Sequence, residues 1–171
     1  MSVQLSYAGP SGGSGGKIVD PQDPNHQPQF IDANNPPPVA TASVILATDD
    51  CRISELIIHA GSSIDAIAAS YVGSQDNPYG TLKMGGNGGT EWIIQLQADE
   101  YLVQVDCYYS NVVHWIQLAT NMKKGYAFGN ASGVFSTYNA PPGFMIIGFW
   151  GGAGDLIDRL GVIIRPVPNS Q

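Results

Sequence analysis

Two five-residue segments with the pattern G-x-x-[I/L]-D are the part of this chain best suited to binding a polar ligand. They occupy residues 61–65 (GSSID) and 154–158 (GDLID), each between two apolar runs typical of strands. Glycine-rich segments occur at residues 12–16 (GGSGG) and 85–89 (GGNGG). A turn that ends in a carboxylate supplies acceptors, and a glycine loop supplies backbone N–H donors that no side chain covers. Together these groups suit a ligand that both donates and accepts hydrogen bonds.

A pyranose is a ligand of that kind, because its adjacent hydroxyls each donate and accept. A carboxylate can accept two hydroxyl donors from one edge of the ring, and such charge-assisted hydrogen bonds are roughly twice as strong as neutral ones. The aspartate that ends each turn is therefore a candidate acceptor. A backbone N–H beside a loop glycine is a candidate donor, because no Cβ crowds the ring there.

The composition predicts an all-β protein of one domain. Of its 171 residues, 43% are apolar and only 12% are charged, with 21 glycines and 12 prolines. Long surface helices need many charged residues on their wet face, so this composition favours short strands and many turns. The formal net charge of −7 leaves no basic stripe, and we expect no nucleic-acid partner.

The expected location of the protein is cytoplasmic, or outside the cell by an unconventional route. Residues 1–7 lack the basic start and apolar core of a secretory signal. No apolar run reaches the roughly 18 residues needed to span a membrane. Two cysteines are too few for a disulfide framework, and we expect Cys51 and Cys107 to be free thiols in a reducing compartment.

Short apolar runs separated by turn signals predict about eleven strands and no helix. Residues 17–40 are polar and rich in proline, so we expect a long surface loop inserted into the domain. Residues 63–71 contain several alanines and could form a helix, but their period-two alternation favours a strand. The predicted strands lie at residues 2–7, 41–48, 52–60, 64–72, 91–97, 101–109, 112–120, 126–129, 134–138, 144–150 and 156–165.

The motifs resemble those of one known family. The glycine segments, the run EYLV at residues 100–103 and the ending IGFWGGAGDLIDRLGV at residues 147–162 are similar to the jacalin-related lectins. The resemblance covers nearly the whole chain apart from residues 17–40. It implies that residues 1–171 form one domain, a β-prism I of three four-stranded Greek-key sheets with pseudo-threefold symmetry.

The resemblance also implies where a carbohydrate would bind. The main site would combine the backbone N–H groups of Gly16, Asp155 and Leu156 with the carboxylate of Asp158. A second candidate site would use Gly89 with Gly61, Ser62, Ser63 and Asp65. The third repeat, around residues 111–115, has no Asp at the expected place, which argues against a third site.

The same resemblance indicates the ligand class. The uninterrupted N-terminus, and Asp155 and Leu156 where the galactose-binding branch has aromatic residues, are more similar to the mannose/glucose branch. The implied partners are mannose- or glucose-type glycans and glycoproteins. We expect a homo-oligomer, because several sites raise the apparent affinity of a shallow site. The alternative is a structural or interaction module that has kept the scaffold and lost sugar binding.

Less specific roles exist for these carboxylates and glycines. Residues 12–16 could be a flexible linker, but the similar segment at residues 85–89 lies between predicted strands and disfavours this. Asp65 and Asp158 could instead cap their turns through the local backbone. Asp155 and Asp158 match a glycosidase pair only in residue type, because a three-residue spacing on a turn does not set the separation of two carboxylates. We expect no catalytic residue and no enzyme activity.

The histidines and tryptophans are expected to be structural. His26, His59 and His114 lie far apart, without Cys or acidic residues at ligand spacing, so no metal site and no cofactor are expected. Trp92 and Trp150 could stack on a sugar, but strand tryptophans usually pack in the core, and we favour that role for both.

Overall fold

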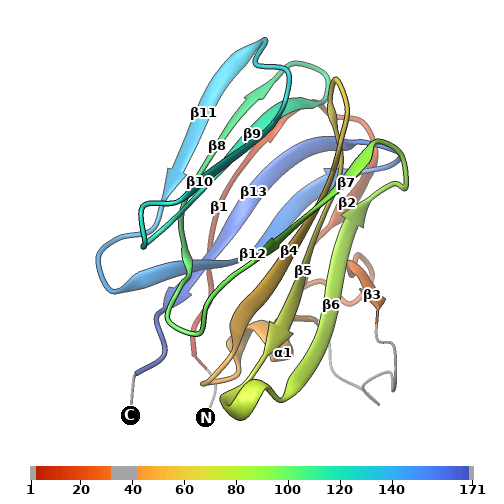
Figure 1. The fold of residues 1–171 in the computed structure, drawn as a ribbon. Coiled ribbons are helices and arrows are strands. Elements are labelled where there is room, and N and C mark those ends of the chain that lie inside the picture. The colour runs from red at the N-terminus through yellow and green to blue at the C-terminus, as the bar shows by residue number, and fades with distance from the viewer. Residues whose placement is uncertain (1–2, 32–41, 170–171) are drawn as a thin grey trace.

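Strands make up nearly all of the regular structure in the computed structural model, which describes residues 3–31 and 42–169. The strands surround a common core, and the first and last described residues lie at the same end of the molecule (Figure 1). The elements within the described ranges are β1 (Ser6–Gly12), β2 (Lys17–Val19), β3 (Gln29–Ile31), α1 (Ala42–Ala47), β4 (Arg52–Ala60), β5 (Ile64–Val72), the 3-10 helix η1 (Ser74–Asp76), β6 (Pro78–Gly85), β7 (Thr90–Gln95), β8 (Leu102–Tyr109), β9 (Val113–Thr120), β10 (Gly125–Gly129), β11 (Val134–Asn139), β12 (Phe144–Ala153) and β13 (Ile157–Pro166).

The strands form three antiparallel sheets of the same construction. The first has the order β1-β13-β12-β2, the second β3-β6-β5-β4-β7, and the third β10-β9-β8-β11. The first and third are joined where Ile146 of β12 pairs with Leu102 of β8. In each sheet a tight hairpin supplies two middle strands, and a glycine-containing loop connects the outer strands across the end of that hairpin. This is the predicted β-prism, with β3 added to the edge of the second sheet.

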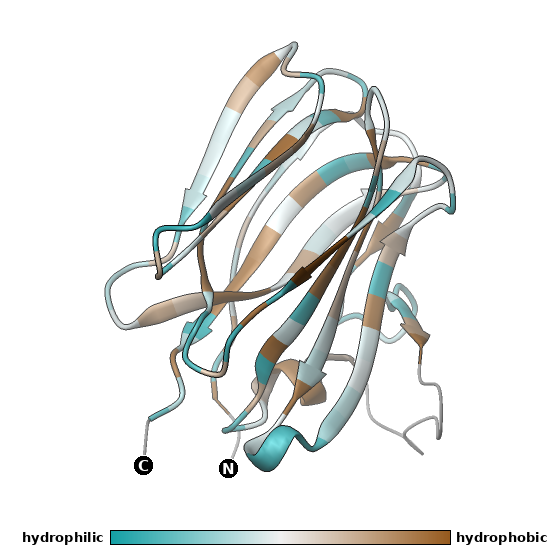
Figure 2. Ribbon diagram, in the orientation of Figure 1, coloured by the Kyte–Doolittle hydropathy of each residue, from teal (hydrophilic) through white to brown (hydrophobic). Residues whose placement is uncertain are grey.

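The core lies between the three sheets, because alternate side chains of each middle strand point inward. Figure 2 shows hydrophobic and hydrophilic residues alternating along several strands. Burying one such aliphatic side chain contributes about 1.5–3 kcal/mol. Fully buried members from the three sheets include Leu56, Ile58, Ile116, Leu118 and Leu160.

The expected strand at residues 41–48 is wrong, because this segment forms the helix α1. Ala42, Ile45 and Leu46 are buried, at the three- and four-residue spacing of one helix face. Thr41 lies outside the described residues. The guanidinium of Arg165, which is 1% exposed, donates to the carbonyl oxygens of Leu46 (3.0 Å), Thr48 (2.6 Å) and Asp49 (3.0 Å). This tertiary contact satisfies carbonyl groups at the C-terminal end of the helix.

Residues 17–31 are also more regular than the expected surface loop. Lys17–Val19 pairs with β12 and Gln29–Ile31 pairs with β6, so this segment extends two of the sheets. The rest of the predicted insertion, residues 32–40, lies outside the described residues.

One predicted strand is displaced and another strand was not predicted. The first strand runs from Ser6 to Gly12 rather than over residues 2–7, of which residue 2 lies outside the described residues, and β6 was not predicted. The sequence of β6, PYGTLKMG, combines a proline and two glycines with few apolar residues, so it carries little strand signal. The strand favoured for residues 63–71 is confirmed as β5.

Both cysteines are free thiols, as expected, and the structure buries both of them. Burial raises the pKa of Cys51 to about 12 and that of Cys107 to about 11, because a thiolate is disfavoured away from water. Both groups are therefore protonated and poorly reactive at neutral pH.

Candidate functional site

The two G-x-x-[I/L]-D segments are equivalent hairpin turns at the end of the prism opposite the termini (Figure 1). Residues 154–158 lead from β12 into β13, and residues 61–65 lead from β4 into β5. In each turn the first glycine N–H donates to the carbonyl of the third residue. The N···O distance is 2.9 Å from Gly154 to Leu156 and 3.0 Å from Gly61 to Ser63. The two segments therefore share one backbone conformation.

A glycine loop lies over the carboxylate of each turn. The N–H of Gly13 donates to the carbonyl of Asp158, and the N–H of Gly86 donates to the carbonyl of Asp65, both at 2.9 Å. These bonds connect residues 12–16 with the first turn and residues 85–89 with the second. The structure thus brings together the two sets of residues selected from the sequence.

The glycines are required because the loops approach the carboxylates closely. A Cβ at Gly15 would lie 2.7 Å from one oxygen of Asp158, and a Cβ at Gly88 would lie 2.7 Å from one oxygen of Asp65. A Cβ at Gly16 or Gly89 would also be too close to the other oxygen of the aspartate, and these glycines have φ of +69° and +75°, which L-residues rarely adopt. Any side chain here would displace the carboxylate beneath it.

Both carboxylates keep their acceptor capacity. Asp65 and Asp158 are partly exposed, while Ile64 and Ile157 beside them are fully buried and anchor the turns. Neither carboxylate accepts a hydrogen bond from any other residue that the structure describes. The alternative in which these carboxylates cap their own turns therefore finds no supporting bond in the described ranges.

The two loops are held by different side chains that sequence inspection missed. In the first sheet the Arg159 guanidinium donates to the carbonyl of Gly15 at 2.7 Å, across from Gly152 on β12. In the second sheet the ring of His59, across from Ala66, lies 3.1 Å from the carbonyl of Gly88. In both hairpins the large side chain that holds the loop lies across from a small residue. It is on the second strand of the first hairpin (Arg159) and on the first strand of the second hairpin (His59). Strand pairing was needed to find this relation.

The third hairpin has a histidine at the place of the aspartates. Residues 110–114 form the turn, in which the Ser110 N–H donates to the Val112 carbonyl at 3.0 Å. Nδ1 of His114 lies 3.0 Å from Oγ of Ser63, and Nε2 lies 2.6 Å from Oγ of Ser110. The imidazole is thus engaged within the protein and supplies no carboxylate. Its contact with Ser63 also ties the third turn to the second.

Core packing is confirmed for Trp150 and wrong for Trp92. Trp150 is half-buried, with its Nε1 donating to the Ala8 carbonyl at 3.0 Å and its ring 5.2 Å from that of Tyr7. Trp92 is 51% exposed on β7, an edge strand, and its ring centroid lies 6.0 Å from that of Phe128. Ile94 and Leu96 of the same run are buried, whereas Trp92, two residues nearer the glycine loop than Ile94, is exposed.

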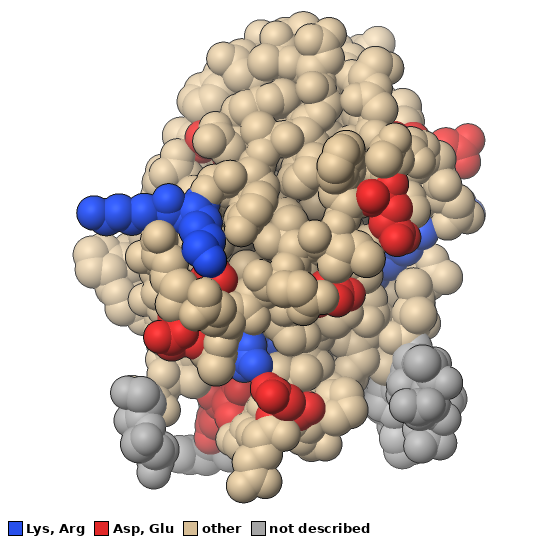
Figure 3. All heavy atoms as spheres, in the orientation of Figure 1, with Lys and Arg blue, Asp and Glu red and all other residues tan. Residues whose placement is uncertain are grey.

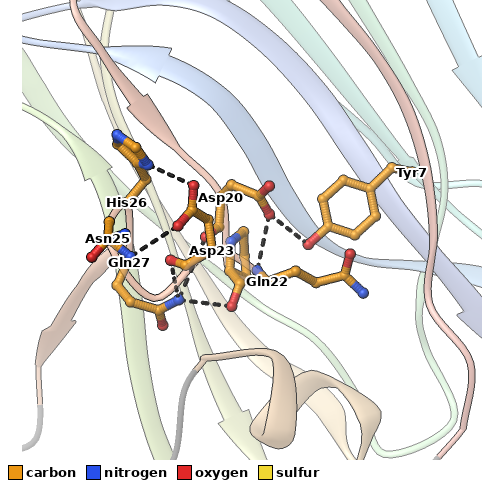
Figure 4. Close-up of polar contacts among 8 residues, drawn as sticks. Tyr7, Asp20, Gln22, Asp23, Asn25, His26 and Gln27 are labelled. Atoms are coloured by element: carbon orange, nitrogen blue, oxygen red, sulfur yellow. Dashed lines mark hydrogen bonds and ion pairs between the residues drawn. The ribbon is translucent and has the colours of Figure 1, made fainter.

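The segment after the first glycine loop forms a compact turn (Figure 4), and residues 25–29 share a surface hollow with Gly154 of the main candidate site. Asp20 accepts hydrogen bonds from the hydroxyl of Tyr7 and the N–H of Gln22, both at 2.9 Å. The amide of Gln27 donates to the carbonyls of Pro21 and Asp23, both at 2.8 Å. Local hydrogen bonds therefore shape this part of the predicted insertion without a large core.

Neither the charged side chains nor the possible metal ligands indicate a further site on the described surface. On the face shown in Figure 3, charged side chains are scattered between large uncharged areas. No group of three His, Cys, Asp or Glu side chains suited to a metal ion occurs in residues 3–31 and 42–169. Within the same ranges, no helix has the length and apolar character to cross a membrane.

A prism of this kind, with a glycine loop over a carboxylate turn, defines a β-prism lectin, and the comparisons agree. A mannose-binding jacalin-related lectin from Ananas comosus is similar to this chain at 24% identity and a TM-score of 0.69, over 95% of this chain and 98% of that one. Artocarpin complexed with methyl-α-mannose is similar at 20% identity and a TM-score of 0.71, over the same shares of the two chains.

Residues 8–163 match the jacalin-like lectin domain, so the chain belongs to this family of non-catalytic lectins. Horcolin from Hordeum vulgare is 29% identical over 121 residues, which are 67% of this chain and 83% of that protein. Jacalin-related lectin 3 from Arabidopsis thaliana is 32% identical over 129 residues, which are 70% of this chain but 21% of that protein.

Proposed function

We propose that the chain binds mannose- or glucose-type glycans through Gly16, Asp155, Leu156 and Asp158. The observation that carries this proposal is the glycine loop lying over Asp158 while that carboxylate keeps its acceptor capacity. The similarity to a mannose-binding lectin and to a lectin complexed with methyl-α-mannose supports the sugar class.

In this proposal the carboxylate supplies the acceptors for the sugar and the backbone supplies the donors. Asp158 accepts hydrogen bonds from two neighbouring hydroxyls, and the N–H groups of Gly16, Asp155 and Leu156 donate to the sugar oxygens. The N–H of Gly154 already serves the turn. Leu156, which is partly buried, offers an apolar edge to the ring. Arg159 acts indirectly, because its bond to Gly15 fixes the donor loop before the sugar arrives.

The second site of the proposal uses Gly89, Gly61, Ser62, Ser63 and Asp65. It repeats the turn, the loop and the carboxylate of the main site. It differs at the third turn position, where Ser63 stands in place of Leu156 and contacts His114. This site therefore lacks an apolar edge at that position, and we expect it to bind one monosaccharide more weakly.

Removing each carboxylate tests the proposal and separates the two sites. We expect Asp158→Ala to abolish most binding of methyl α-mannoside in calorimetric titration, and Asp65→Ala to remove a weaker component. A shallow site with a dissociation constant of roughly 1 mM is worth about −4 kcal/mol, so losing two charge-assisted hydrogen bonds leaves no measurable affinity. Asp99→Ala, at an exposed position, is the matched control.

Unchanged mannoside binding by Asp158→Ala would contradict the main site. If the unaltered protein bound no member of a broad glycan panel but formed a stable complex with a protein, the structural or interaction module would be the better description.

A further inference from the structure

Two hollows of similar size lie beside the two candidate turns. One has a volume of about 280 Å³ and is lined at the turn by Ala153 and Gly154. The other also has a volume of about 280 Å³ and is lined at the turn by Ala60 and Gly61. Each therefore continues directly from the end of a candidate sugar site onto the neighbouring sheet.

The two hollows occupy equivalent places in the pseudo-threefold prism. Gly85 pairs with Ala66 just after Asp65, as Gly129 pairs with Trp115 just after His114. Positions on the glycine loops and their flanking strands can therefore be matched between repeats. Val19 stands three residues after Gly16, as Trp92 does after Gly89, and Met84 precedes Gly85 as Phe128 precedes Gly129. All four of these side chains line the hollows.

The hollows differ in what lines them. The hollow at Gly154 has the aliphatic side chains Val19 and Met84, and residues 25–29 of the compact turn also line it. The hollow at Gly61 has Trp92 and Phe128 in the same places, with Thr90 and Ala127 beside them. The two rings are tilted by 41° with centroids 6.0 Å apart, and Trp92 is 51% exposed. An exposed tryptophan in a concave surface is thus special to the second site.

We propose that Trp92 and Phe128 form a subsite for a further sugar unit of an oligosaccharide whose end is held at Asp65. This inference rests on the proposed function, because it extends the second site. One face of a pyranose carries mainly C–H groups, which pack on an aromatic ring, while its hydroxyls stay in water or reach Thr90. The volume is near the roughly 300 Å³ at the small end of ligand pockets. The second site therefore selects oligosaccharides over monosaccharides.

The test uses Asp158→Ala, which removes the main site, and compares methyl α-mannoside with mannotriose by calorimetric titration. We expect the trisaccharide to bind this variant at least fivefold more tightly than the monosaccharide. Adding Trp92→Ala should remove that advantage, a roughly fivefold to tenfold loss for the trisaccharide alone. Trp92→Phe should retain most of the advantage. Phe135→Ala is the matched control, because Phe135 is 50% exposed on β11 and does not line the hollow.

Fluorescence gives an independent readout of the same event. Mannotriose should change the tryptophan emission of Asp158→Ala, and the change should disappear when Trp92→Phe is added. Equal trisaccharide binding with and without Trp92→Ala would overturn the inference, as would an Asp158→Ala protein that binds neither sugar. A dimer that dissociates on Trp92→Ala would also overturn it, because Trp92 would then contact a second copy. Failure of the unaltered protein to bind either sugar would instead contradict the proposed function.

Discussion

At the scale of single residues, two features define the main candidate site: loop glycines that a side chain could not replace, and a carboxylate that is left available as an acceptor. Gly15 and Gly16 leave no space for a side chain above Asp158, and that carboxylate accepts no bond from the described residues. The third repeat shows the opposite outcome, because His114 is held by Ser63 and Ser110. A histidine at the position of the two aspartates therefore gives the third turn a structural contact in place of a candidate site.

Asp50 gives a prediction at the same scale. Its carboxylate accepts hydrogen bonds from the Tyr79 hydroxyl at 2.6 Å, from the Ser74 N–H at 2.8 Å and from the Ser74 hydroxyl at 2.9 Å. The Tyr79 bond, followed by the backbone bond, lowers the pKa of Asp50 from 3.8 to about 2. The folded-state pKa is depressed, so the stabilisation is fully present above pH 3.8 and is lost as the pH falls towards 2.

We expect Asp50→Asn to lower the free energy of unfolding at pH 7 by about 1 kcal/mol, because the three charge-assisted bonds to this carboxylate weaken. The difference from the unaltered protein should shrink in urea denaturation between pH 4 and pH 2. Asp99→Asn, at an exposed position, serves as control. A difference that stays constant over this pH range would show that the carboxylate charge is not responsible.

At the scale of elements, α1 shows how tertiary contacts override a local pattern. Its sequence ASVILA is apolar with two β-branched residues, which favour strands. The observed helix buries one face and presents its last carbonyls to Arg165 of β13. The partner lies more than a hundred positions away in the sequence, so local propensity could not reveal it.

Arg165→Met tests this contact. We expect the free energy of unfolding to fall by roughly 2–4 kcal/mol, because the buried Leu46 carbonyl and the part-buried Asp49 carbonyl lose this donor, while the Thr48 carbonyl keeps only the Cys51 N–H. Urea denaturation measures this change, and Lys124→Met, at an exposed basic residue, is the control. A loss below about 0.5 kcal/mol, the usual range for surface substitutions, would show that the carbonyls find other partners.

At the scale of the whole molecule, the three-sheet prism sets the number and spacing of the candidate sites. Two of the three equivalent turns carry an aspartate, and both lie at one end of the prism (Figure 1). Sites on one end can engage branches of the same glycan, whereas crosslinking separate glycoproteins favours sites that face apart. We therefore expect crosslinking to depend on assembly of several chains.

Precipitation of a mannose-rich glycoprotein tests this expectation. We expect Asp65→Ala to retain at least half of the precipitation, because a homo-oligomer still presents several main sites, and Asp158→Ala to lose most of it. Size-exclusion chromatography of the same samples gives the number of chains. A monomer that precipitates the glycoprotein only with both aspartates present would contradict a role for assembly.

The sequence by itself determined that the fold is rich in strands. It also determined that both turns and both glycine loops belong to candidate sites. These features depend on local sequence patterns, because a glycine permits a tight loop and an aspartate supplies a carboxylate at any place in the fold. Only the tertiary structure decided that residues 42–47 are helical, that Arg159 and His59 hold the loops, and that His114 contacts Ser63. It also decided that Trp92 lies exposed in a hollow beside Gly61. Each of these outcomes depends on strand register and on which sheets become neighbours, and neither is encoded within a short stretch of chain.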